Sequence, residues 1–496
     1  SKALASTKAS STCHRVATPA LAASSTAGGE TPAWVLHTAT LARNDGMATK
    51  PSRRYRQRHP DRAACWVALG LRLVNALLTE LTWRGFVAHS TDLDALSAAL
   101  DEGQVKSYVG FDPTAPSIHM GNLVQLMLAR RLQAHGHRPF LLVGGSTGLI
   151  GDPKQSSERN LNPKDVVHEW VERIRGQVSK FVDFDGPAAA TVVNNYDWTA
   201  ELSTLDFLRD IGKHFSINRM LDREVVKARL ETGISYTEFS YMLLQSLDFL
   251  ELYRRHGVTM QTGGSDQWGN LTSGVELIRR ADGGKAHALA TPLLTKADGT
   301  KFGKTESGTV WLDPAMTSPY AFHQFFLNAE DAMVSTYLRI FSERSKEEID
   351  EVLREQAEAP HRRIAQRALA DDITDLVHSR QERESATAAA AAIFGSGELR
   401  ALSPDVLAAV HAELGGVHLS DPGESLAFVD LLVQSGVVAS KGAARRAIEE
   451  GGAYLNNQKV TQVDRLIGAE DLLPGNFVVV RRGRKTVGSL KIARLP

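Results

Sequence analysis

Three polar segments of the chain carry residue types that could hold a phosphorylated nucleotide. The first runs Tyr108-Val-Gly-Phe-Asp-Pro-Thr-Ala-Pro-Ser-Ile-His-Met-Gly-Asn122, and His119 and Gly121 lie where its loop meets an expected helix. Unpaired backbone N–H groups at a helix start favour phosphate, and a glycine lets the phosphate approach closely. A histidine at such a position is more often a helix cap or a surface residue, so this segment needs the support of the others.

The second segment, Lys301-Phe-Gly-Lys-Thr305, lies in a loop rich in glycine and lysine. Two lysines three residues apart can clamp a polyphosphate as point charges. The end of the segment resembles the tail of a P-loop, but that motif requires a glycine where this chain has Asp298. The P-loop is therefore excluded, and a solvated basic turn remains the alternative.

The third segment, Gly263-Gly-Ser-Asp-Gln-Trp-Gly-Asn270, is a predicted tight polar loop. Its glycines allow the backbone to contact a sugar, and the Asp266 carboxylate could accept hydrogen bonds from ribose hydroxyls. An ordinary capping turn is the alternative for this segment taken alone.

A fourth set of polar residues lies on one face of an expected helix. Tyr241, Gln245 and Asp248 are spaced four and three residues apart, which places them on one side. A polar triplet on a buried helix face is costly unless it meets a partner. A substrate with a phenol and an amino group would satisfy it. The alternative is a polar crossing between two helices.

The elements around these segments predict a parallel sheet. A strand at 107–111, a helix at 120–134 and a short apolar strand at 139–143 form one βαβ unit, with Gly136 as the expected helix C-cap. Ligands of such sheets bind at the carboxyl ends of the strands. Alternation of strands and helices continues to about residue 310, and a mostly helical pattern follows. The expected helices are about 73–86, 165–182, 204–215 and 238–253, with the helical pattern from 318 to 414.

Length and composition exclude several classes of protein. A chain of 496 residues should hold more than one domain, and its formal net charge of +0 means that any nucleic acid must be held by a local patch. Cys13 and Cys65 are the only cysteines, so the rest of the chain has no disulfide framework and no cysteine zinc site. No apolar run approaches the roughly 18–20 residues that span a bilayer.

Residues 1–70 differ in composition from the rest. Glu30, Asp45 and Asp61 are the only acidic residues among them, against ten lysines and arginines. This composition is typical of an organellar transit peptide. A disordered leader or an upstream mistranslation is the alternative, since the first methionine is Met47.

Taken together, the segments resemble the signatures of the class I aminoacyl-tRNA synthetases. His119-Met-Gly-Asn122 stands for the HIGH signature and Lys301-Phe-Gly-Lys-Thr305 for KMSKS. From about residue 77 to the C-terminus the chain is most similar to bacterial tyrosyl-tRNA synthetases. The segments that carry this closer resemblance are Gly148-Leu-Ile-Gly-Asp-Pro153, Asn195-Tyr-Asp-Trp198, Phe239-Ser-Tyr-Met-Leu-Leu-Gln245 and the stretch 295–305.

The resemblance implies a role for each matching residue. Those expected to bind tyrosine are Tyr108 and Asp248 at the phenol, Asp152, Tyr241 and Gln245 at the ammonium group, and Gln267 near the carboxylate. Those expected at the nucleotide are Asp112, Gly121, Asn122, Gly264, Asp266 and Lys304. Those expected at the departing phosphates are Thr114, His119, Lys301, Lys304 and Thr305, with Lys154 and Arg159 in a pyrophosphate loop.

The chain also departs from the family pattern at three places. Asn122 replaces the final histidine of the first signature, and its amide can still donate to phosphate or ribose. Val109 stands where many members have a cysteine that contacts ribose, so that hydrogen bond should be missing. The loop after Asp152 looks one residue shorter than usual.

The last part of the chain contains a basic helix, Ser440-Lys-Gly-Ala-Ala-Arg-Arg-Ala-Ile448, and the basic stretch Val480-Arg-Arg-Gly-Arg-Lys485. It resembles a small RNA-binding domain, and at the end of a synthetase it should bind tRNA. A solvated basic tail is the alternative. The expected tRNA contacts are Lys441, Arg445, Arg446, Arg481, Arg482, Arg484 and Lys485.

The resemblance predicts an α/β fold in four parts: a leader at 1–70, a Rossmann-like catalytic domain at 71–317, a helical anticodon-side domain at 318–423, and a C-terminal α+β RNA-binding domain at 424–496. The expected activity is tyrosine–tRNA ligation with ATP and Mg²⁺, without a tightly bound cofactor or a protein metal site.

The expected partners are tyrosine, ATP, tRNA(Tyr) and a second copy of the chain, with no membrane. The expected location is a chloroplast or mitochondrion, with a bacterial cytoplasm as the alternative. The rival activities are a tryptophanyl-tRNA synthetase and a noncatalytic RNA-binding protein such as a splicing factor.

Overall fold

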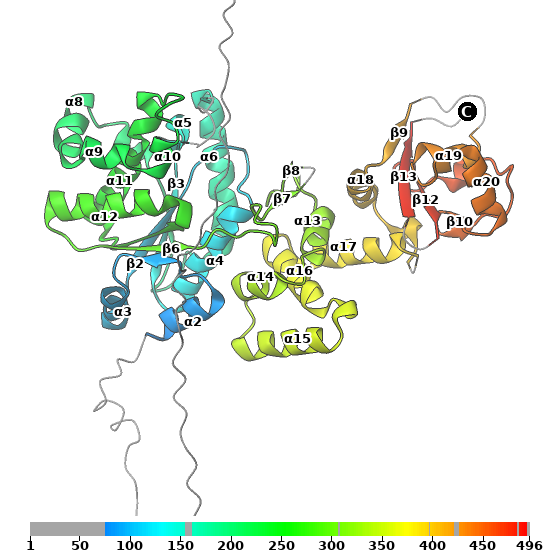
Figure 1. The fold of residues 1–496 in the computed structure, drawn as a ribbon, viewed down its shortest axis with the longest axis horizontal. Coiled ribbons are helices and arrows are strands. Elements are labelled where there is room, and N and C mark those ends of the chain that lie inside the picture. Colours follow the sequence, from blue (N-terminus) through cyan, green and yellow to red (C-terminus); the bar gives the residue numbers. More distant parts are fainter. Residues whose placement is uncertain are drawn as a thin grey trace, which may run out of the picture. The chain divides into compact units, whose positions relative to one another are not determined.

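Figure 1 shows the fold of the chain in a computed structural model. The structure describes residues 75–153, 161–305, 308–395, 397–420, 426–483 and 486–493. The sequence predictions that lie outside this described part are the leader 1–70 and the side chains of Lys154, Arg159, Lys304, Thr305, Arg484 and Lys485.

The first described part forms a six-stranded sheet in the order β1-β6-β5-β2-β3-β4 (Figure 1). The strands from β6 to β4 in this order are parallel, and β1 pairs antiparallel with β6 at one edge. The sheet confirms the predicted parallel α/β fold. Its strands are β1 His89–Ser90, β2 Lys106–Phe111, β3 Arg138–Val143, β4 Thr191–Asn194, β5 Met260–Gly264 and β6 His287–Thr291.

Alternate residues of the central strands face two different layers of helices. Val109 and Leu141 belong to a core shared with α4 and α6, whereas Tyr108 and Phe140 belong to a core shared with α11 and α12. A sheet covered on both faces leaves its strand ends for a ligand. The helices of this part are α2 Ala76–Arg84, α3 Leu93–Glu102, α4 Met120–Ala134, α5 Thr147–Ile150, α6 Lys164–Val178, α7 Tyr196–Thr199, α8 Thr204–Asp206, α9 Ile217–Leu221, α10 Glu224–Lys227, α11 Tyr236–His256 and α12 Trp268–Asp282.

The long helix α11 has clear start and stop signals. The Ser235 hydroxyl accepts a hydrogen bond from the Glu238 N–H at 3.2 Å, and Gly257 ends the helix with a left-handed φ of 66°. A serine N-cap and a glycine just beyond the last turn are the residues that satisfy helix ends best. Helix α4 has the predicted bounds, but its C-cap is His135 and the expected cap Gly136 follows at φ 85°.

The stretch predicted to be helical at 204–215 is helical as far as His214, but its pitch changes along the segment. The segment consists of the short α8, a π-helix at Phe207–Ile211 and a 3-10 helix at Gly212–His214. Phe207 and Phe215 pack against the core beneath α11 and α12. Tertiary packing of these two rings, which local propensity does not register, is a sufficient reason for the change in helical pitch.

Helices follow from residue 319, as predicted. They are α13 Pro319–Leu327, α14 Val334–Phe341, α15 Lys346–Glu358, α16 Ile364–Val377, α17 Arg380–Ile393 and α18 Pro404–Glu413. The buried Arg84 guanidinium of α2 donates to the backbone oxygens of Arg339, Ser342 and Arg344 around the end of α14. This cation therefore caps orphan carbonyls of the helical part with a residue from the sheet part.

The last part is a five-stranded sheet in the order β11-β10-β12-β13-β9 with two helices. Strand β9 pairs parallel with β13, so this sheet takes a strand from the stretch before the boundary predicted at 423. The bounds are β9 Val417–Leu419, α19 Phe428–Gln434, α20 Lys441–Glu449, β10 Ala453–Leu455, β11 Gln458–Lys459, β12 Phe477–Arg482 and β13 Thr486–Ile492. Within the described ranges, the helices are too short or too polar to cross a membrane.

Candidate active site

The polar segments predicted from the sequence converge at the carboxyl ends of the parallel strands. Asp112 follows β2, Gly144 follows β3, Asn195 follows β4, and Asp266 lies just after β5. Because β4, β3, β2 and β5 are neighbours, these loops meet at one edge of the sheet. This is the edge at which open parallel sheets bind ligands.

Two buried side chains, Tyr108 and Asp248, form the deepest part of this edge, and each is 2% exposed. The Tyr108 hydroxyl donates to the backbone oxygen of Gln245 at 3.4 Å. Burial, and then the nearby Asp248 charge, raise the pKa of the Tyr108 phenol well above its ordinary value. Tyr108 therefore remains a neutral hydroxyl, able to exchange hydrogen bonds with another phenol.

The Asp248 carboxylate is held by two donors to which the sequence analysis assigned no role. Trp198 Nε1 donates to Oδ1 at 2.9 Å, and Asn195 Nδ2 donates to Oδ2 at 3.0 Å. Burial raises the pKa of Asp248 to about 7, and these two hydrogen bonds oppose the rise. A signal was available, since both residues belong to the segment Asn195-Tyr-Asp-Trp198 that carries part of the family resemblance.

A second buried group joins Asp112 to the helix α11. Tyr241 donates its hydroxyl proton to Asp112 Oδ2 at 2.6 Å, and Thr147 donates to Asp112 Oδ1 at 2.6 Å. The sequence placed Tyr241 with the ammonium group and Asp112 with the nucleotide. The structure brings the two into direct contact, so a substrate there meets a shared network. Burial, and then Asp112, raise the pKa of Tyr241, which keeps it a donor.

Asp152 and Gln267 also lie together. Gln267 Nε2 donates to Asp152 Oδ2 at 2.7 Å, and Asn270 Nδ2 donates to Gln267 Oε1 at 2.8 Å. Arg223 Nη1 supports Asn270 from behind, at 2.6 Å from its Oδ1. The Asp152 carboxylate therefore brings an acceptor for a cationic group to this corner of the site. Gln245 lies half-buried on α11 between Tyr241 and Asp248.

Of the residues predicted for phosphate, those whose side chains the structure describes are exposed. The side chains of Lys301 and Asp266 are 64% and 43% exposed, and Lys301 Nζ lies 3.9 Å from Asp266 Oδ2. Thr114 lies exposed in the loop after β2, and Gly264 precedes Asp266 at the end of β5. The backbone of Lys304 and Thr305 forms a short strand β7 paired with β8, Gly308–Thr309. These groups line the mouth of the site.

His119 and Asn122 close the start of α4 as a reciprocal cap. His119 Nδ1 accepts from the Gly121 N–H at 3.0 Å, and Asn122 Oδ1 accepts from the His119 N–H at 3.1 Å. His119 therefore caps the helix through its Nδ1 atom, which is the alternative role that the sequence analysis gave this residue. The exposed ring of His119 lies 6.1 Å from that of Trp311, beside the Lys301 loop. Val109 is buried in the core shared with α4, and its hydrocarbon side chain has no group that could form a hydrogen bond.

Two glycines after β3 leave the space that these polar groups occupy. A Cβ at Gly144 would lie 2.2 Å from Asp112 Oδ1 and 2.3 Å from Thr147 Oγ1. A Cβ at Gly145 would lie 2.3 Å from Asn194 Oδ1. Any side chain at either position would displace the site, so the close approach of this turn requires glycine.

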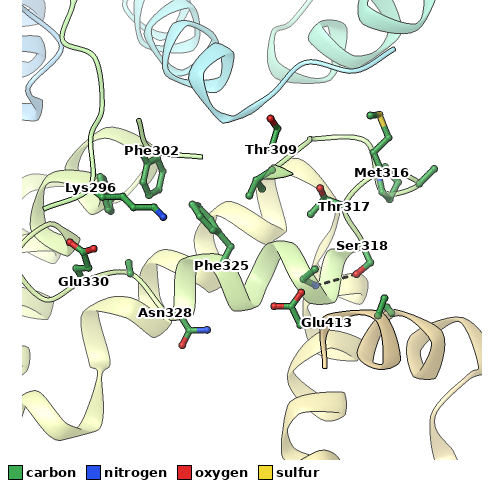
Figure 2. Close-up of a pocket in the computed structure, with 18 residues that line it drawn as sticks. Lys296, Phe302, Thr309, Met316, Thr317, Ser318, Phe325, Asn328, Glu330 and Glu413 are labelled. Atoms are coloured by element: carbon green, nitrogen blue, oxygen red, sulfur yellow. Dashed lines mark hydrogen bonds between the residues drawn. The ribbon is translucent and has the colours of Figure 1, made fainter. Parts of the chain in front are cut away.

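The Lys301 loop rests on aromatic residues of the helical part. The ring of Phe302 lies 4.0 Å from that of Tyr337 and 5.0 Å from that of Phe325, centroid to centroid. The Tyr337 hydroxyl donates to the Thr295 backbone oxygen at 2.7 Å, at the start of the loop. Figure 2 shows Phe302 and Phe325 at the wall of a cavity of about 620 Å³. The helical part of the chain therefore supports the Lys301 loop through these contacts.

The predicted tRNA-binding residues do not all lie on the surface. Lys441, Arg445 and Arg446 lie on α20, and Lys441 Nζ is 2.7 Å from Asp430 Oδ1. Arg482 is exposed, but Arg481 is 8% exposed and its guanidinium lies 4.4 Å from the centre of the Tyr454 ring. Arg481 is therefore a packing residue of this sheet, which argues against a direct contact with RNA.

Comparison with known families identifies the class. A model of the family described as tRNA synthetases class I (W and Y) matches residues 100–395. A model of the tyrosine–tRNA ligase SYY-like C-terminal domain matches residues 411–487. The chain therefore belongs to the class I tRNA synthetases.

Comparison with individual relatives shows which kind of class I synthetase the chain resembles. The tyrosine–tRNA ligase of Cutibacterium acnes is 61% identical over 414 residues, covering 84% of this chain and 99% of the relative. That of Streptomyces avermitilis is 57% identical over 419 residues, with the same coverage. The crystal structure of a C-terminally truncated mitochondrial tyrosyl-tRNA synthetase from Aspergillus nidulans superposes with a TM-score of 0.59 at 30% identity, covering 65% of this chain and 95% of that one. Within its class, the chain is a tyrosine–tRNA ligase.

Proposed function

We propose that the chain joins tyrosine to ATP at this sheet edge, releases pyrophosphate, and transfers the tyrosyl group to the 3′ end of its tRNA. The observation that carries this proposal is the buried pair of Tyr108 and Asp248 beside the exposed nucleotide segments. A buried hydroxyl and a buried carboxylate suit a substrate phenol. A tryptophan side chain has a single N–H donor and no hydroxyl to offer them.

Tyrosine would lie along the network already described. Its phenol would donate to Asp248 and accept from Tyr108, and its ammonium group would lie among Asp152, Tyr241 and Gln245. Gln267 would lie near the carboxylate. That carboxylate is ionised at pH 7, because α-carboxyl pKa values are about 3.3–3.7. The first step therefore needs no general base.

The nucleotide would lie against Asp112, Gly121, Asn122, Gly264 and Asp266. A tyrosine carboxylate oxygen would attack the α-phosphate, and the bond to the β-phosphate would break. Thr114, His119, Lys301, Lys304 and Thr305 would stabilise the charge on the departing pyrophosphate, which is an effect on the transition state. The 3′-terminal tRNA hydroxyl would then attack the carbonyl of the adenylate and release AMP.

Mg²⁺ would enter with the phosphates of ATP. No group of three or more His, Cys, Asp or Glu side chains is placed to hold a metal ion in the part of the chain that the structure describes. The oxygens of a polyphosphate are the ligands that Mg²⁺ prefers at such sites.

Amino-acid-dependent ATP–pyrophosphate exchange tests the proposal. Exchange should require tyrosine and be negligible with tryptophan, because only tyrosine satisfies the Tyr108 and Asp248 pair. Equal exchange with tryptophan would overturn the substrate assignment.

The C-terminal sheet should bind tRNA through the exposed face of α20. Because β9 pairs with β13, cutting the chain near residue 423 would separate paired strands, so substitutions are the cleaner test. Arg445→Glu with Arg446→Glu should raise the KM for tRNA and leave pyrophosphate exchange unchanged. Normal charging at low tRNA concentration would refute this role for the helix.

The chain should form a homodimer through the segment 205–236. Five large apolar side chains lie exposed there: Leu205, Leu208, Ile217, Leu230 and Tyr236. Phe207 and Phe215, in the same segment, already pack against the core of the chain. Exposed apolar groups concentrated in one segment favour association. A monomer at micromolar concentration in analytical ultracentrifugation would reject the dimer.

Residues 1–70 should direct the protein to a chloroplast, a mitochondrion or both. The support is their composition, which is poor in acids and rich in arginine, serine and alanine. Fusing residues 1–76 to a fluorescent protein in a plant or algal cell tests this. A diffuse cytosolic signal would favour the alternative of a bacterial cytoplasmic enzyme.

A further inference from the structure

Thr147 lies between the two polar groups of the site, at the first residue of α5 and 2% exposed. One group contains Asp248, the carboxylate proposed to bind the tyrosine phenol. The other group contains Asp112, the carboxylate proposed to lie beside the nucleotide. The Thr147 hydroxyl contacts both groups. It accepts from Asn195 Nδ2 at 3.0 Å and donates to Asp112 Oδ1 at 2.6 Å.

The direction of every hydrogen bond in this chain of contacts is fixed. Asn195 Oδ1 accepts from the Ser146 N–H at 2.7 Å, which orients the amide. Its two N–H groups are then used on Asp248 and on Thr147. A hydroxyl has a single proton, and Thr147 gives it to Asp112. No other orientation satisfies all the acceptors.

We propose that Thr147 is a positioning residue that fixes both the carboxylate that recognises the tyrosine phenol and the carboxylate beside the nucleotide. This inference rests on the proposed function and deepens it, because it assigns a shared support to the recognition of two substrates. Thr147 itself need not touch either of them.

The burial of the network makes the hydroxyl hard to replace. Asn195 is 0% exposed, so water cannot readily satisfy an N–H that loses Thr147. A buried donor without a partner is costly, and Asn195 would then turn or shift. Either movement would withdraw its other N–H from Asp248. Asp112 would lose one of its donors at the same time, although Tyr241 would still hold Oδ2.

Thr147→Val tests the proposal, because valine keeps the shape and removes the hydroxyl. Thr147→Ser restores the hydroxyl, and Thr147→Ala removes it without any steric conflict. Thr374→Val is a matched control, since Thr374 is also fully buried but lies in α16, and its Oγ1 has no hydrogen-bond partner within the described residues. Each variant is measured for kcat and KM with tyrosine, phenylalanine and ATP, with the active fraction found by titration.

We expect Thr147→Val to lower kcat/KM for tyrosine about 10- to 100-fold. The loss for phenylalanine should be smaller, because phenylalanine has no hydroxyl to place on Asp248. The KM for ATP should also rise. Thr147→Ser should recover the Tyr/Phe ratio, Thr147→Ala should match the valine variant, and Thr374→Val should behave as the wild type.

A merely structural role predicts a different result. It would reduce the active fraction and leave the Tyr/Phe ratio of the active enzyme at the wild-type value in both Thr147→Val and Thr147→Ala, and that result would overturn the proposal. Failure of the wild-type chain to exchange pyrophosphate with tyrosine is a separate outcome, and it would overturn the proposed function instead.

Discussion

The tyrosine side and the phosphate side of the site differ in how far their contacts are complete before a substrate binds. Asp248 is 2% exposed and already accepts hydrogen bonds from Asn195 and Trp198. Lys301 is 64% exposed, and its contact with Asp266 is a long 3.9 Å. An exposed ion pair of this kind contributes little, so ATP can displace it at small cost.

This difference separates recognition from catalysis. A rigid, buried pocket rejects the wrong amino acid, because its polar groups are left unpaired by any substrate without the phenol. Exposed cations can instead follow phosphates as charge develops on them, and such interactions raise the rate rather than the affinity. Substitutions on the two sides should therefore change different kinetic constants.

Asp248→Ala should have the largest effect, on the recognition side. The Tyr/Phe ratio of kcat/KM should fall roughly 10³-fold, because a site that bonds the substrate hydroxyl discriminates by up to about 10⁵-fold. Pyrophosphate exchange with both amino acids provides the measurement. Glu251→Ala, on the same helix, is the control. An unchanged ratio would mean that Asp248 does not bind the phenol.

Lys301→Ala should lower kcat for adenylate formation by about 10²-fold and leave the Kd of tyrosine unchanged. The reason is that the side-chain ammonium group of Lys301 would act mainly on the departing pyrophosphate. Single-turnover kinetics and equilibrium binding separate the two constants. Lys296→Ala, earlier in the same loop, is the control. A loss confined to tyrosine binding would contradict the division between the two sides.

Phe302→Ala should lower the same kcat by about tenfold, since the loop would lose its aromatic support on Tyr337 and Phe325 while its lysines remain. Phe302→Met should recover most of the rate, because it refills the apolar site. Phe394→Ala, an exposed phenylalanine, is the control. A wild-type rate in Phe302→Ala would show that the loop positions itself without the helical part.

Changing the pH should have the smallest effect and should act on the tyrosine side. Burial raises the pKa of Asp248 to about 7, so the carboxylate becomes protonated as the pH falls below that value. The protonated form cannot accept the phenol proton as strongly, and the Kd of tyrosine should rise about fivefold from pH 7 to pH 6. A flat Kd between pH 6 and pH 8 would show that Asp248 stays ionised throughout.

The sequence predicted the scaffold well wherever local patterns decide structure. Strands β2 and β3 and helix α4 lie within a residue or two of the predicted bounds, because short apolar runs and a turn-rich loop specify them. The segment 204–215 is helical as predicted, but its changes of pitch were not predicted, because they depend on where Phe207 and Phe215 pack. Distant contacts of that kind leave little trace in a local pattern.

The partners within the site could not be derived from spacing. Tyr241 and Asp112 are 129 residues apart, and Gln267 and Asp152 are 115 apart. Helix spacing put Tyr241 on the same face as Asp248, but only the fold determines which carboxylate it meets. Arg481 is a residue for which the local sequence suggested the wrong environment. It lies in a run of basic residues, which suggested a surface position, but β12 pairs on both sides and Arg481 is buried.

Gly144 and Gly145, the glycines after β3, limit the ways in which this enzyme could be engineered to accept a different amino-acid substrate. Every replacement at Gly144 or Gly145 puts a carbon atom within 2.3 Å of a polar oxygen of the site. A library that randomises these two positions would consist almost wholly of inactive clones. Diversity is better directed at Tyr108 and Asp248, where a changed side chain alters the shape offered to the substrate ring and removes no hydrogen bond to the turn at 144–147.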